Sequence, residues 1–326
     1  MDYFIEKRRE VMKYVEPVML EKMWDFLKPI DENWQPSDLL PDPVQHNFLE
    51  QIEEIQERAA GLSYDLLAVL VGDTVTEEAL PTYESWLSMV EDVNMDEAGG
   101  WMRWIRHWTA EENRHGDILN KYLYLSGRVN MRMMEVSTQH LIADGFDIGT
   151  GSDPYRNFIY TSFQEIATNV SHRRTATLAK LQGDAVLSKI CGTIASDEAR
   201  HAKAYQFFME KIFEVDPNGG MLAFADMMQK KIVMPAHFLR EFGEPQGLAF
   251  AHFSDVAQRL NVYTALDYVE ILNTLIKNWK IADLSGLSDA AEKSRDYLMK
   301  LPQRLNRIVE HRKMTYGDFK FSWING

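Results

Sequence analysis

The sequence predicts an all-α protein, and three observations lead to this prediction. Apolar residues recur at spacings of three and four along ten separate segments, as they do on the buried face of a helix. The alternation of apolar and polar residues that indicates β-strands is almost absent. Proline, glycine and asparagine cluster between the segments, where helices end. The sequence therefore indicates a bundle of helices joined by short breaks.

The expected helices are bounded by these breaks. WQPSDLLPDP at 34–43 separates the first two, NMDEAGG at 94–100 precedes the fourth, and GTGSDP at 149–154 precedes the sixth. DPNGG at 216–220 and FGEPQG at 242–247 end the seventh and eighth. In chain order the expected helices are 6–28, 46–60, 64–90, 100–125, 130–143, 155–182, 184–213, 219–241, 251–273 and 289–313.

Length and composition limit the class of protein. A chain of 326 residues, of which 45% are hydrophobic, can bury a large core. No break is long enough to link independent domains, so we expect one domain over residues 1–326. The longest apolar runs, such as LLAVLVG at 66–72, are far shorter than the roughly 18 residues of a membrane span. We therefore expect no membrane partner.

Charge and cysteine content indicate the compartment and exclude some partners. Thirty-five basic and 49 acidic residues give a net charge of -14, which repels nucleic acid and anionic lipid. The single cysteine, Cys191, excludes an internal disulfide and fits a reducing compartment, where such a thiol is usually a core residue. No targeting segment is evident, so we expect a bacterial cytoplasmic protein, or a plastid stromal one if the chain is a processed form.

Two short motifs carry the chemistry. WTAEENRH at 108–115 places Glu112 three residues before His115, and IASDEARH at 194–201 places Glu198 three residues before His201. Residues three apart on a helix share one face, about 5–6 Å apart at Cβ. Each motif can therefore offer a carboxylate and an imidazole to one metal ion.

Each motif also follows another glutamate at nearly the same distance. Glu112 lies 35 positions after Glu77, and Glu198 lies 33 positions after Glu165. A helix, a turn and part of an antiparallel return helix span such a distance, so each pair can meet at one level of a bundle. One Glu-x-x-His is expected about 0.7 times by chance, but two matched copies are not. The pattern is that of di-iron or di-manganese carboxylate bundles, and it suits those metals better than structural zinc.

Spacing alone leaves the metal-binding acid of each motif open. Glu111 and Asp197 lie four residues before the histidines and share their helical faces as well. An acid that does not bind metal could accept a hydrogen bond from the free nitrogen of a ligating histidine, and Asp197 is a candidate for this role. For Glu111 and Glu78 we expect a solvated position.

Longer stretches resemble the soluble acyl-[acyl-carrier-protein] desaturases, typified by the plant plastid stearoyl enzymes, over residues 33–324. The matching stretches are NWQPSDLLPDP, VGDTVTEEALPTY, WTAEENRHGDILNKYLYLSGRV, FIYTSFQEIAT, ICGTIASDEARH, LAFADMMQKKIVMPAH, HFSDVAQRLNVYTALDY and FSWI. The resemblance implies a ferritin-like di-iron four-helix bundle core with additional packed helices. It also implies two iron ions per chain, with the ligands Glu77, Glu112, His115, Glu165, Glu198 and His201.

The resemblance further implies an activity and its partners. The family inserts a cis double bond into an acyl chain on acyl carrier protein, using dioxygen and electrons from ferredoxin, and a homodimer is expected. Trp34 and Asp197 are implied to support the ligands, and the Thr168 hydroxyl to lie on the oxygen-binding side of the cluster. Lys230 and Lys231 are the expected docking patch for the acidic carrier protein.

Three residues are expected to shape the slot for the acyl tail. Asn157 lies eight residues before Glu165, about 12 Å along a helix, and stands where the plant stearoyl enzymes carry glycine. Trp86 and Met89 likewise replace smaller residues of the family. A shortened slot would favour palmitoyl or shorter chains over stearoyl.

Other functions remain open on the ligand pattern alone. They are a di-iron hydroxylase or oxidase on the same fold, a ferritin-like iron-binding protein, and a radical subunit like that of ribonucleotide reductase. The last would need a tyrosine near the metal, for which Tyr64, Tyr83 and Tyr160 are candidates that spacing cannot place.

Overall fold

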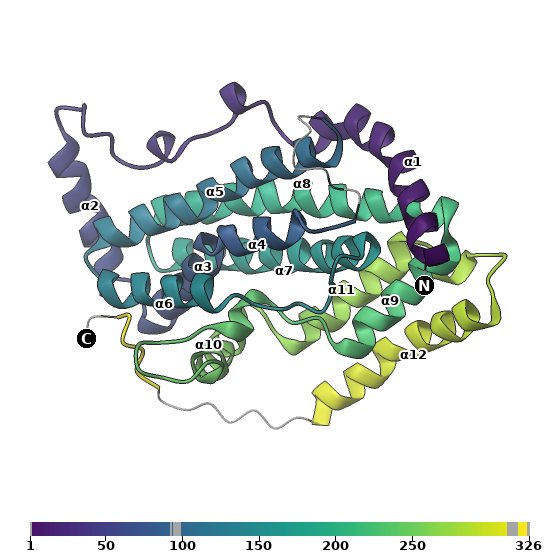
Figure 1. Ribbon diagram of the computed structural model, residues 1–326. Helices are drawn as coiled ribbons and strands as arrows, with labels where there is room; N and C mark the ends of the chain where they lie inside the picture. Colours follow the sequence, from purple (N-terminus) through teal and green to yellow (C-terminus); the bar gives the residue numbers. More distant parts are fainter. Residues whose placement is uncertain (1, 92, 94–98, 312–318, 325–326) are drawn as a thin grey trace.

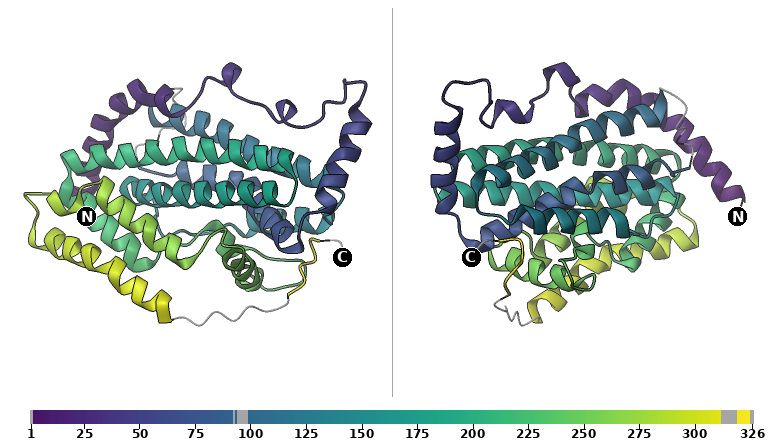
Figure 2. Two further views of the ribbon diagram at one scale, coloured as in Figure 1. Left: turned by 180° about the vertical axis from the view of Figure 1, so that it is seen from behind. Right: turned by 60° about the vertical axis from the view of Figure 1, so that its left-hand side comes forward.

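The computed structural model describes residues 2–91, 93, 99–311 and 319–324. Within these residues the secondary structure is helical and there are no β-strands, as the sequence predicts (Figure 1). Four helices form the bundle: α3 (Tyr64–Glu78), α5 (Gly100–Ser126), α7 (Pro154–Leu181) and α8 (Ala185–Val215). The longer three run side by side in all views, with α7 packed along α8 and α3 packed on α5 (Figure 2).

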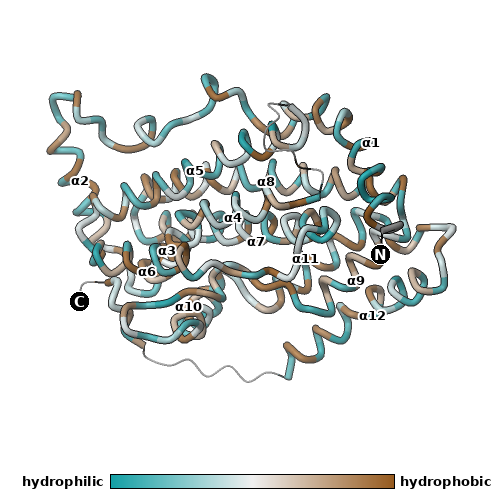
Figure 3. The backbone as a smooth tube through the Cα atoms, in the orientation of Figure 1, coloured by the Kyte–Doolittle hydropathy of each residue, from teal (hydrophilic) through white to brown (hydrophobic). Residues whose placement is uncertain are grey.

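Eight further α-helices surround the bundle. They are α1 (Asp2–Phe26), α2 (Phe48–Ala60), α4 (Leu80–Leu87), α6 (Met131–Asp144), α9 (Pro217–Lys230), α10 (Leu248–Arg259), α11 (Ala265–Asn278) and α12 (Asp289–His311). Helices α9 to α12 cover one side of the bundle, where α9 and α11 pack on α7 and α10 packs on α3 (Figure 1). Polar and apolar positions alternate along most of these helices, as expected for helices with one buried face (Figure 3).

Side-chain caps fix where the two central helices start. The Asp153 carboxylate accepts from Tyr155 N at 2.9 Å at the start of α7, and Pro154 occupies the first helical position. Asp184 caps α8 by accepting from Leu187 N at 2.8 Å. Both helices therefore begin within a residue or two of the predicted positions.

One predicted helix, 64–90, is divided in the structure. Helix α3 ends at Glu78, Ala79 lies outside helical geometry, and α4 then begins at Leu80 and ends at Leu87. Pro81 is the cause, because it has no N–H to donate and its ring clashes with a preceding turn. The break leaves Glu77 in the last turn of α3.

Two other predicted helices are also wrong in extent. Segment 219–241 is α-helical only to Lys230, because Lys231 adopts a φ of 65°, and a short 3-10 helix follows at Pro235–Phe238. Segment 251–273 splits into α10 and α11, because Asn261 adopts a φ of 55° and Thr264 begins a new capping box with Asp267. In segment 289–313, residues 312 and 313 lie outside the described residues.

The described C-terminal residues return to the bundle. Ile324 forms an isolated bridge with Val129, and the buried Trp323 donates from Nε1 to Ser137 Oγ at 2.8 Å. In the described part of the chain no single helix is long and apolar enough to cross a membrane, and α2 with α3–α4 reaches that length only across a bend of 118°.

Candidate metal centre

The six predicted ligands converge in the middle of the four-helix bundle. Their oxygen and nitrogen atoms form two overlapping groups, each within 4.8 Å. Glu112 and Glu198 belong to both groups. Glu77 and His115 complete one group, and Glu165 and His201 complete the other. The geometry thus provides two adjacent positions, each with its own glutamate and histidine, that share two carboxylates.

Several atoms of this cluster have the environment of metal ligands. His201 Nδ1 lies 2.6 Å from Glu112 Oε1, and His115 Nδ1 lies 3.1 Å from Glu198 Oε1. All four atoms are buried, yet none has a hydrogen-bond partner. Buried polar atoms are rarely left without a partner, so these closely spaced atoms are suited to bind one metal ion between them. Four carboxylates with two imidazoles suit iron or manganese.

Electrostatics also favour cations at this position. Burial raises the pKa of the Glu165 carboxyl well above its usual range, and the charges of Glu112 and Glu198 raise it further. Burial likewise raises the pKa of Glu77 to about 7, although a hydrogen bond to His172 opposes it. Positive charge between these carboxylates would stabilise their ionised forms.

Each histidine contacts the acid that precedes the other motif. His201 Nε2 lies 2.9 Å from Glu111 Oε2, and His115 Nε2 lies 3.5 Å from Asp197 Oδ2. Trp34 donates from Nε1 to the same Asp197 oxygen at 2.8 Å. The structure therefore places Trp34 and Asp197 beside the ligands, and it places Glu111 in the equivalent position at the other histidine.

The predicted solvated position of Glu111 is wrong, since its side chain is only 3% exposed. It accepts hydrogen bonds from Lys28 N at 2.7 Å, Asn33 Nδ2 at 2.9 Å and Arg200 Nη2 at 2.8 Å. Burial alone would raise the pKa of Glu111, but His201 and Arg200 outweigh it and lower the pKa to about 2. Glu111 is therefore an ionised acceptor for the imidazole.

Glu78 is also less solvated than predicted. Its carboxylate accepts from Asn120 Nδ2 at 2.5 Å and from Thr138 Oγ1 at 3.3 Å, which connects α3 to α5 and α6. Burial raises the pKa of this carboxyl. Among the residues that the structure describes, the metal cluster does not include Glu78.

The sequence analysis did not predict two residues that contact the carboxylates of Glu77 and Glu165. His172 Nε2 lies 2.9 Å from Glu77 Oε1, and Trp108 donates from Nε1 to Glu165 Oε1 at 3.2 Å. His172 follows Glu165 by seven positions and Trp108 precedes Glu112 by four, so both share a helical face with a ligand. That periodicity is a signal that could have found them.

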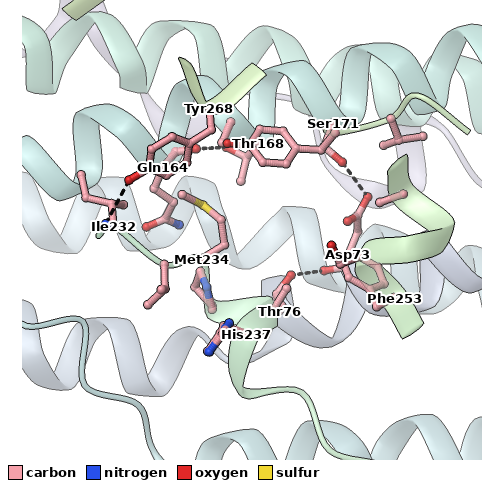
Figure 4. Close-up of a pocket in the computed structure, with 18 of the residues that line it drawn as sticks. Asp73, Thr76, Gln164, Thr168, Ser171, Ile232, Met234, His237, Phe253 and Tyr268 are labelled. Atoms are coloured by element: carbon pink, nitrogen blue, oxygen red, sulfur yellow. Dashed lines mark hydrogen bonds between the residues drawn. The ribbon is translucent and has the colours of Figure 1, made fainter. Parts of the chain in front are cut away.

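The cluster opens into a cavity of about 380 Å³. Side chains of the bundle form one wall, which we call the polar wall: Asp73, Thr76, Glu77, Glu112, Gln164, Thr168, Ser171 and Glu198. The facing wall is largely apolar and comes from the 232–237 segment, α10, α11 and α12, with Met234, Phe253 and Tyr268 among its members (Figure 4). Thr168 Oγ1 donates to Glu198 Oε2 at 2.7 Å, which places this hydroxyl beside the cluster.

The three predicted slot residues lie beyond the residues that line this cavity. Trp86 packs edge-on against Tyr160, with ring centroids 5.9 Å apart. Asn157 is buried and donates from Nδ2 to Asp153 O at 2.9 Å. Met89 is 66% exposed, so the structure does not bring it to the cavity.

The two lysines of the expected docking patch lie at the end of α9. Lys230 Nζ is 3.0 Å from Asp226 Oδ2 and donates to Gly149 O at 3.2 Å. Lys231 is exposed, and the next residue, Ile232, lines the cavity. Of the tyrosines considered for a radical site, Tyr83 lines the cavity and Tyr160 donates to the backbone oxygen of Val233, which also lines it. Tyr64 accepts a hydrogen bond from Phe321 N instead.

Known proteins are similar in sequence to this chain over nearly its whole length. The chain is 51% identical to the stearoyl-[acyl-carrier-protein] 9-desaturase of Spinacia oleracea, over 98% of this chain and 81% of that one. It is 52% identical to the corresponding Ricinus communis protein, over 97% and 81%. A solved structure from Mycobacterium tuberculosis H37Rv, provisionally assigned as an acyl-ACP desaturase, shares the fold with a TM-score of 0.54 at 17% identity, covering 87% of this chain and 99% of that chain. The model of the family described as fatty acid desaturase matches residues 7–325, and by this match and these identities the chain belongs to that family.

Proposed function

We propose that this protein is an acyl-[acyl-carrier-protein] desaturase that inserts a cis double bond into a saturated acyl chain, with two iron ions as cofactor and ferredoxin as electron donor. The observation that carries this proposal is the cavity, because its polar wall includes Glu77, Glu112 and Glu198 while its facing wall is apolar. An acyl chain bound there would pass directly beside the metal cluster. An iron-storage protein would not require such a cavity.

The six ligand residues would hold the two iron ions, with Glu112 and Glu198 shared between them. The chemistry that the bound ions supply is the reductive activation of dioxygen. Glu111 and Asp197 orient the two imidazoles through their Nε2 atoms. The protein itself positions one part of the acyl chain and excludes bulk water.

Substitution of ligands tests the proposal. We expect Glu112→Ala and His201→Ala to reduce iron below two per chain and to abolish desaturation, because the remaining buried carboxylates lose a shared counter-charge. Asp117→Ala is the control, since this acid is on the same helix and pairs with Lys121 at the surface. Iron analysis and fatty-acid analysis after incubation with acyl carrier proteins, dioxygen and reduced ferredoxin provide the readouts. Full iron content and activity in either ligand variant would refute the assignment.

We also propose that the acidic carrier protein docks beside Lys230 and Lys231. The support is the exposure of Lys231 next to Ile232, which lines the cavity. A second cationic candidate is on α12, where Arg304 and Arg307 are exposed and flank the cavity residue Leu305. Both patches could attract an acidic partner in spite of the net charge of -14.

Charge reversal distinguishes the two patches. We expect Lys230→Glu with Lys231→Glu to lower kcat/KM by on the order of tenfold at low salt and less at high salt, because salt screens the attraction. Arg304→Glu with Arg307→Glu is the competing variant. The control is Lys121→Glu, which reverses a surface charge on α5 outside both patches. A decrease in kcat/KM confined to the α12 variant would indicate that the carrier protein docks on α12.

The homodimer rests on the family resemblance, whereas the other remaining assignments rest on charge, apolar run length and cysteine content. We propose a homodimer, without nucleic-acid or membrane partners, in the bacterial cytoplasm or the plastid stroma. Light scattering of the purified protein would measure the oligomeric state.

A further inference from the structure

The polar wall of the cavity includes two side chains that neither the ligand set nor the docking site uses. Asp73 on α3 lies four residues before Glu77, and Ser171 on α7 lies three residues after Thr168. At these spacings each residue shares a helical face with its partner, one turn farther from the metal cluster. Ser171 Oγ donates to Asp73 Oδ2 at 3.2 Å across the gap between the helices (Figure 4).

Asp73 is an unusual residue for a cavity that should bind an acyl chain. It is only 9% exposed, and the facing α10 presents the apolar ring of Phe253 beside it. Burial raises the pKa of Asp73 to about 6, although His172 and Ser171 on α7 act in the opposite direction. A carboxyl group with such a pKa can both carry and release a proton near neutral pH.

Hydroxyl groups continue from this pair to the metal cluster. Ser171 and Thr168 are neighbours on one face of α7, and both line the cavity. Thr168 Oγ1 donates in turn to Glu198 Oε2 at 2.7 Å. Toward the surface, the partly exposed Gln258 and Thr264 line the same cavity. Polar groups thus extend from the outer part of the cavity to a candidate ligand.

The balance of the proposed reaction requires protons from solvent. Two C–H bonds of the acyl chain break and one carbon–carbon π bond forms, which yields two electrons and two protons. The electron donor supplies two more electrons, and solvent must supply two more protons to convert one dioxygen into two waters. With an acyl chain along the apolar wall, protons could reach the cluster only along the polar wall.

We propose that Asp73 and Ser171 form a proton-delivery route that leads from the outer cavity through Thr168 to the metal cluster. This proposal rests on the desaturase function proposed above. Asp73 is the group that stores the proton, and the hydroxyl of Ser171 passes it on. Asp73, Ser171 and Thr168 are on the polar wall and not on the apolar wall along which the acyl chain would bind, so their replacement should not weaken substrate binding.

A first test uses the metal-free protein and needs no catalysis. Infrared spectroscopy should show a carboxylic-acid carbonyl band that is lost with a midpoint near pH 6 as the pH rises, consistent with the raised pKa of Asp73. Because burial also raises the pKa of Glu77 and Glu165, the band is identified in spectra of each variant subtracted from the wild type. The band should be missing in Asp73→Asn and present in Asp65→Asn, a control on the same helix whose carboxylate pairs with Arg259 at the surface. A wild-type spectrum without such a band would overturn the proposal.

A second test uses the iron-loaded enzyme. General acid catalysis contributes on the order of 10²–10⁴ in rate, so Asp73→Asn should lower kcat at least tenfold with KM and iron content unchanged. Hydrogen peroxide should replace water as a product, and Ser171→Ala should show the same change to a smaller extent. The route would be overturned if Asp73→Asn left kcat and the ratio of water to hydrogen peroxide unchanged. It would also be overturned by an increase in KM alone, which would indicate that Asp73 acts in substrate binding.

The two proposals can fail separately. If the wild type reduces dioxygen without desaturating any acyl chain, the proposed function is wrong. The ratio of water to hydrogen peroxide formed by the wild type and by Asp73→Asn then still decides the proton route, because one dioxygen takes up four protons when it becomes two waters but only two when it becomes hydrogen peroxide.

Discussion

The acid that precedes each Glu-x-x-His motif supports the histidine of the other motif. Glu111 is on the helix of His115 but contacts His201, and Asp197 is on the helix of His201 but contacts His115. This exchange connects α5 and α8 through two buried acid–histidine contacts. Of the two acids in each motif, one lies in the candidate metal cluster and the other contacts the opposite imidazole.

Removal of Glu111 should therefore weaken metal binding without removing a ligand. We expect Glu111→Ala to lower iron affinity by about 10–100-fold, because His201 loses the acceptor that fixes its orientation. Glu111→Gln should retain part of the affinity, since an amide oxygen can still accept the hydrogen bond. Iron titration monitored by absorbance would measure both variants.

Asp197→Ala is the matched variant for the other histidine, and Asp117→Ala is the surface control. Equal affinities in Glu111→Ala and Asp117→Ala would contradict the orienting role. A loss in Glu111→Ala as complete as that in Glu112→Ala would instead indicate that Glu111 is itself a ligand.

Spacing could indicate a set of candidate ligands, and Asp197 as a candidate support, but it could not assign Glu111 to a histidine, for a geometric reason. Positions three and four residues from a histidine share its helical face, so Glu111 and Glu112 look equivalent until the crossing of α5 and α8 is known. Periodicity could place His172 and Trp108 on ligand-bearing helical faces, but it could not say which carboxylate each contacts, because that carboxylate is on another helix. Periodicity describes one helix, whereas these contacts join two.

Helix breaks were predicted less well than helix positions. The long helices α5, α7 and α8 match the predicted segments, because their apolar periodicity is long and their ends carry Asp or Gly signals. The division at Ala79 and the end of α9 depend on backbone angles near a proline, which periodicity does not report. The break at Ala79 matters for the candidate site, since it leaves Glu77 in the last turn of α3.

The last turn of α3 is held close to α5 at Gly116. A Cβ atom at this position would lie 3.1 Å from the backbone carbon of Glu77 and 3.0 Å from Glu78 Cγ. The absence of a side chain therefore lets α5 approach the turn that carries a candidate ligand.

We expect Gly116→Ala to destabilise the protein by about 1 kcal/mol, because overpacking of about 1–3 kcal/mol exceeds the gain of about 1 kcal/mol in helix propensity. Iron occupancy should fall as well, since Glu77 is displaced. Gly192→Ala is the control in α8, where a Cβ would meet no atom within 4 Å, and it should stabilise by about 0.5–1 kcal/mol. Urea unfolding and iron analysis measure both, and stabilisation in both variants would exclude close packing at Gly116.

The arrangement of α4 and α7 around the cavity bears on the length of the acyl chain. The cavity ends before Trp86 and Asn157, where the ring of Trp86 packs on Tyr160 and Asn157 is bonded to the start of α7. Asn157 lies seven residues before Gln164, the first residue of α7 that lines the cavity, so these contacts fill space beyond the cavity along α7. A tail that extends beyond the cluster would have to displace them.

We therefore expect the wild type to prefer a C16 or C14 acyl chain over C18, because each excluded methylene costs about 1–3 kcal/mol in discrimination. Asn157→Gly and Trp86→Ala should shift the preference toward C18, since each opens space beyond the cavity. Met89→Ala is the matched comparison: its side chain is 66% exposed, so the geometry predicts no shift even though the family resemblance assigned it to the slot. The measurement is kcat/KM for C14, C16 and C18 acyl carrier proteins in all four proteins. A wild-type preference for C18 that neither Asn157→Gly nor Trp86→Ala changes would exclude a slot shortened by these residues, and a shift in Met89→Ala alone would require a tail path along the outer face of α4.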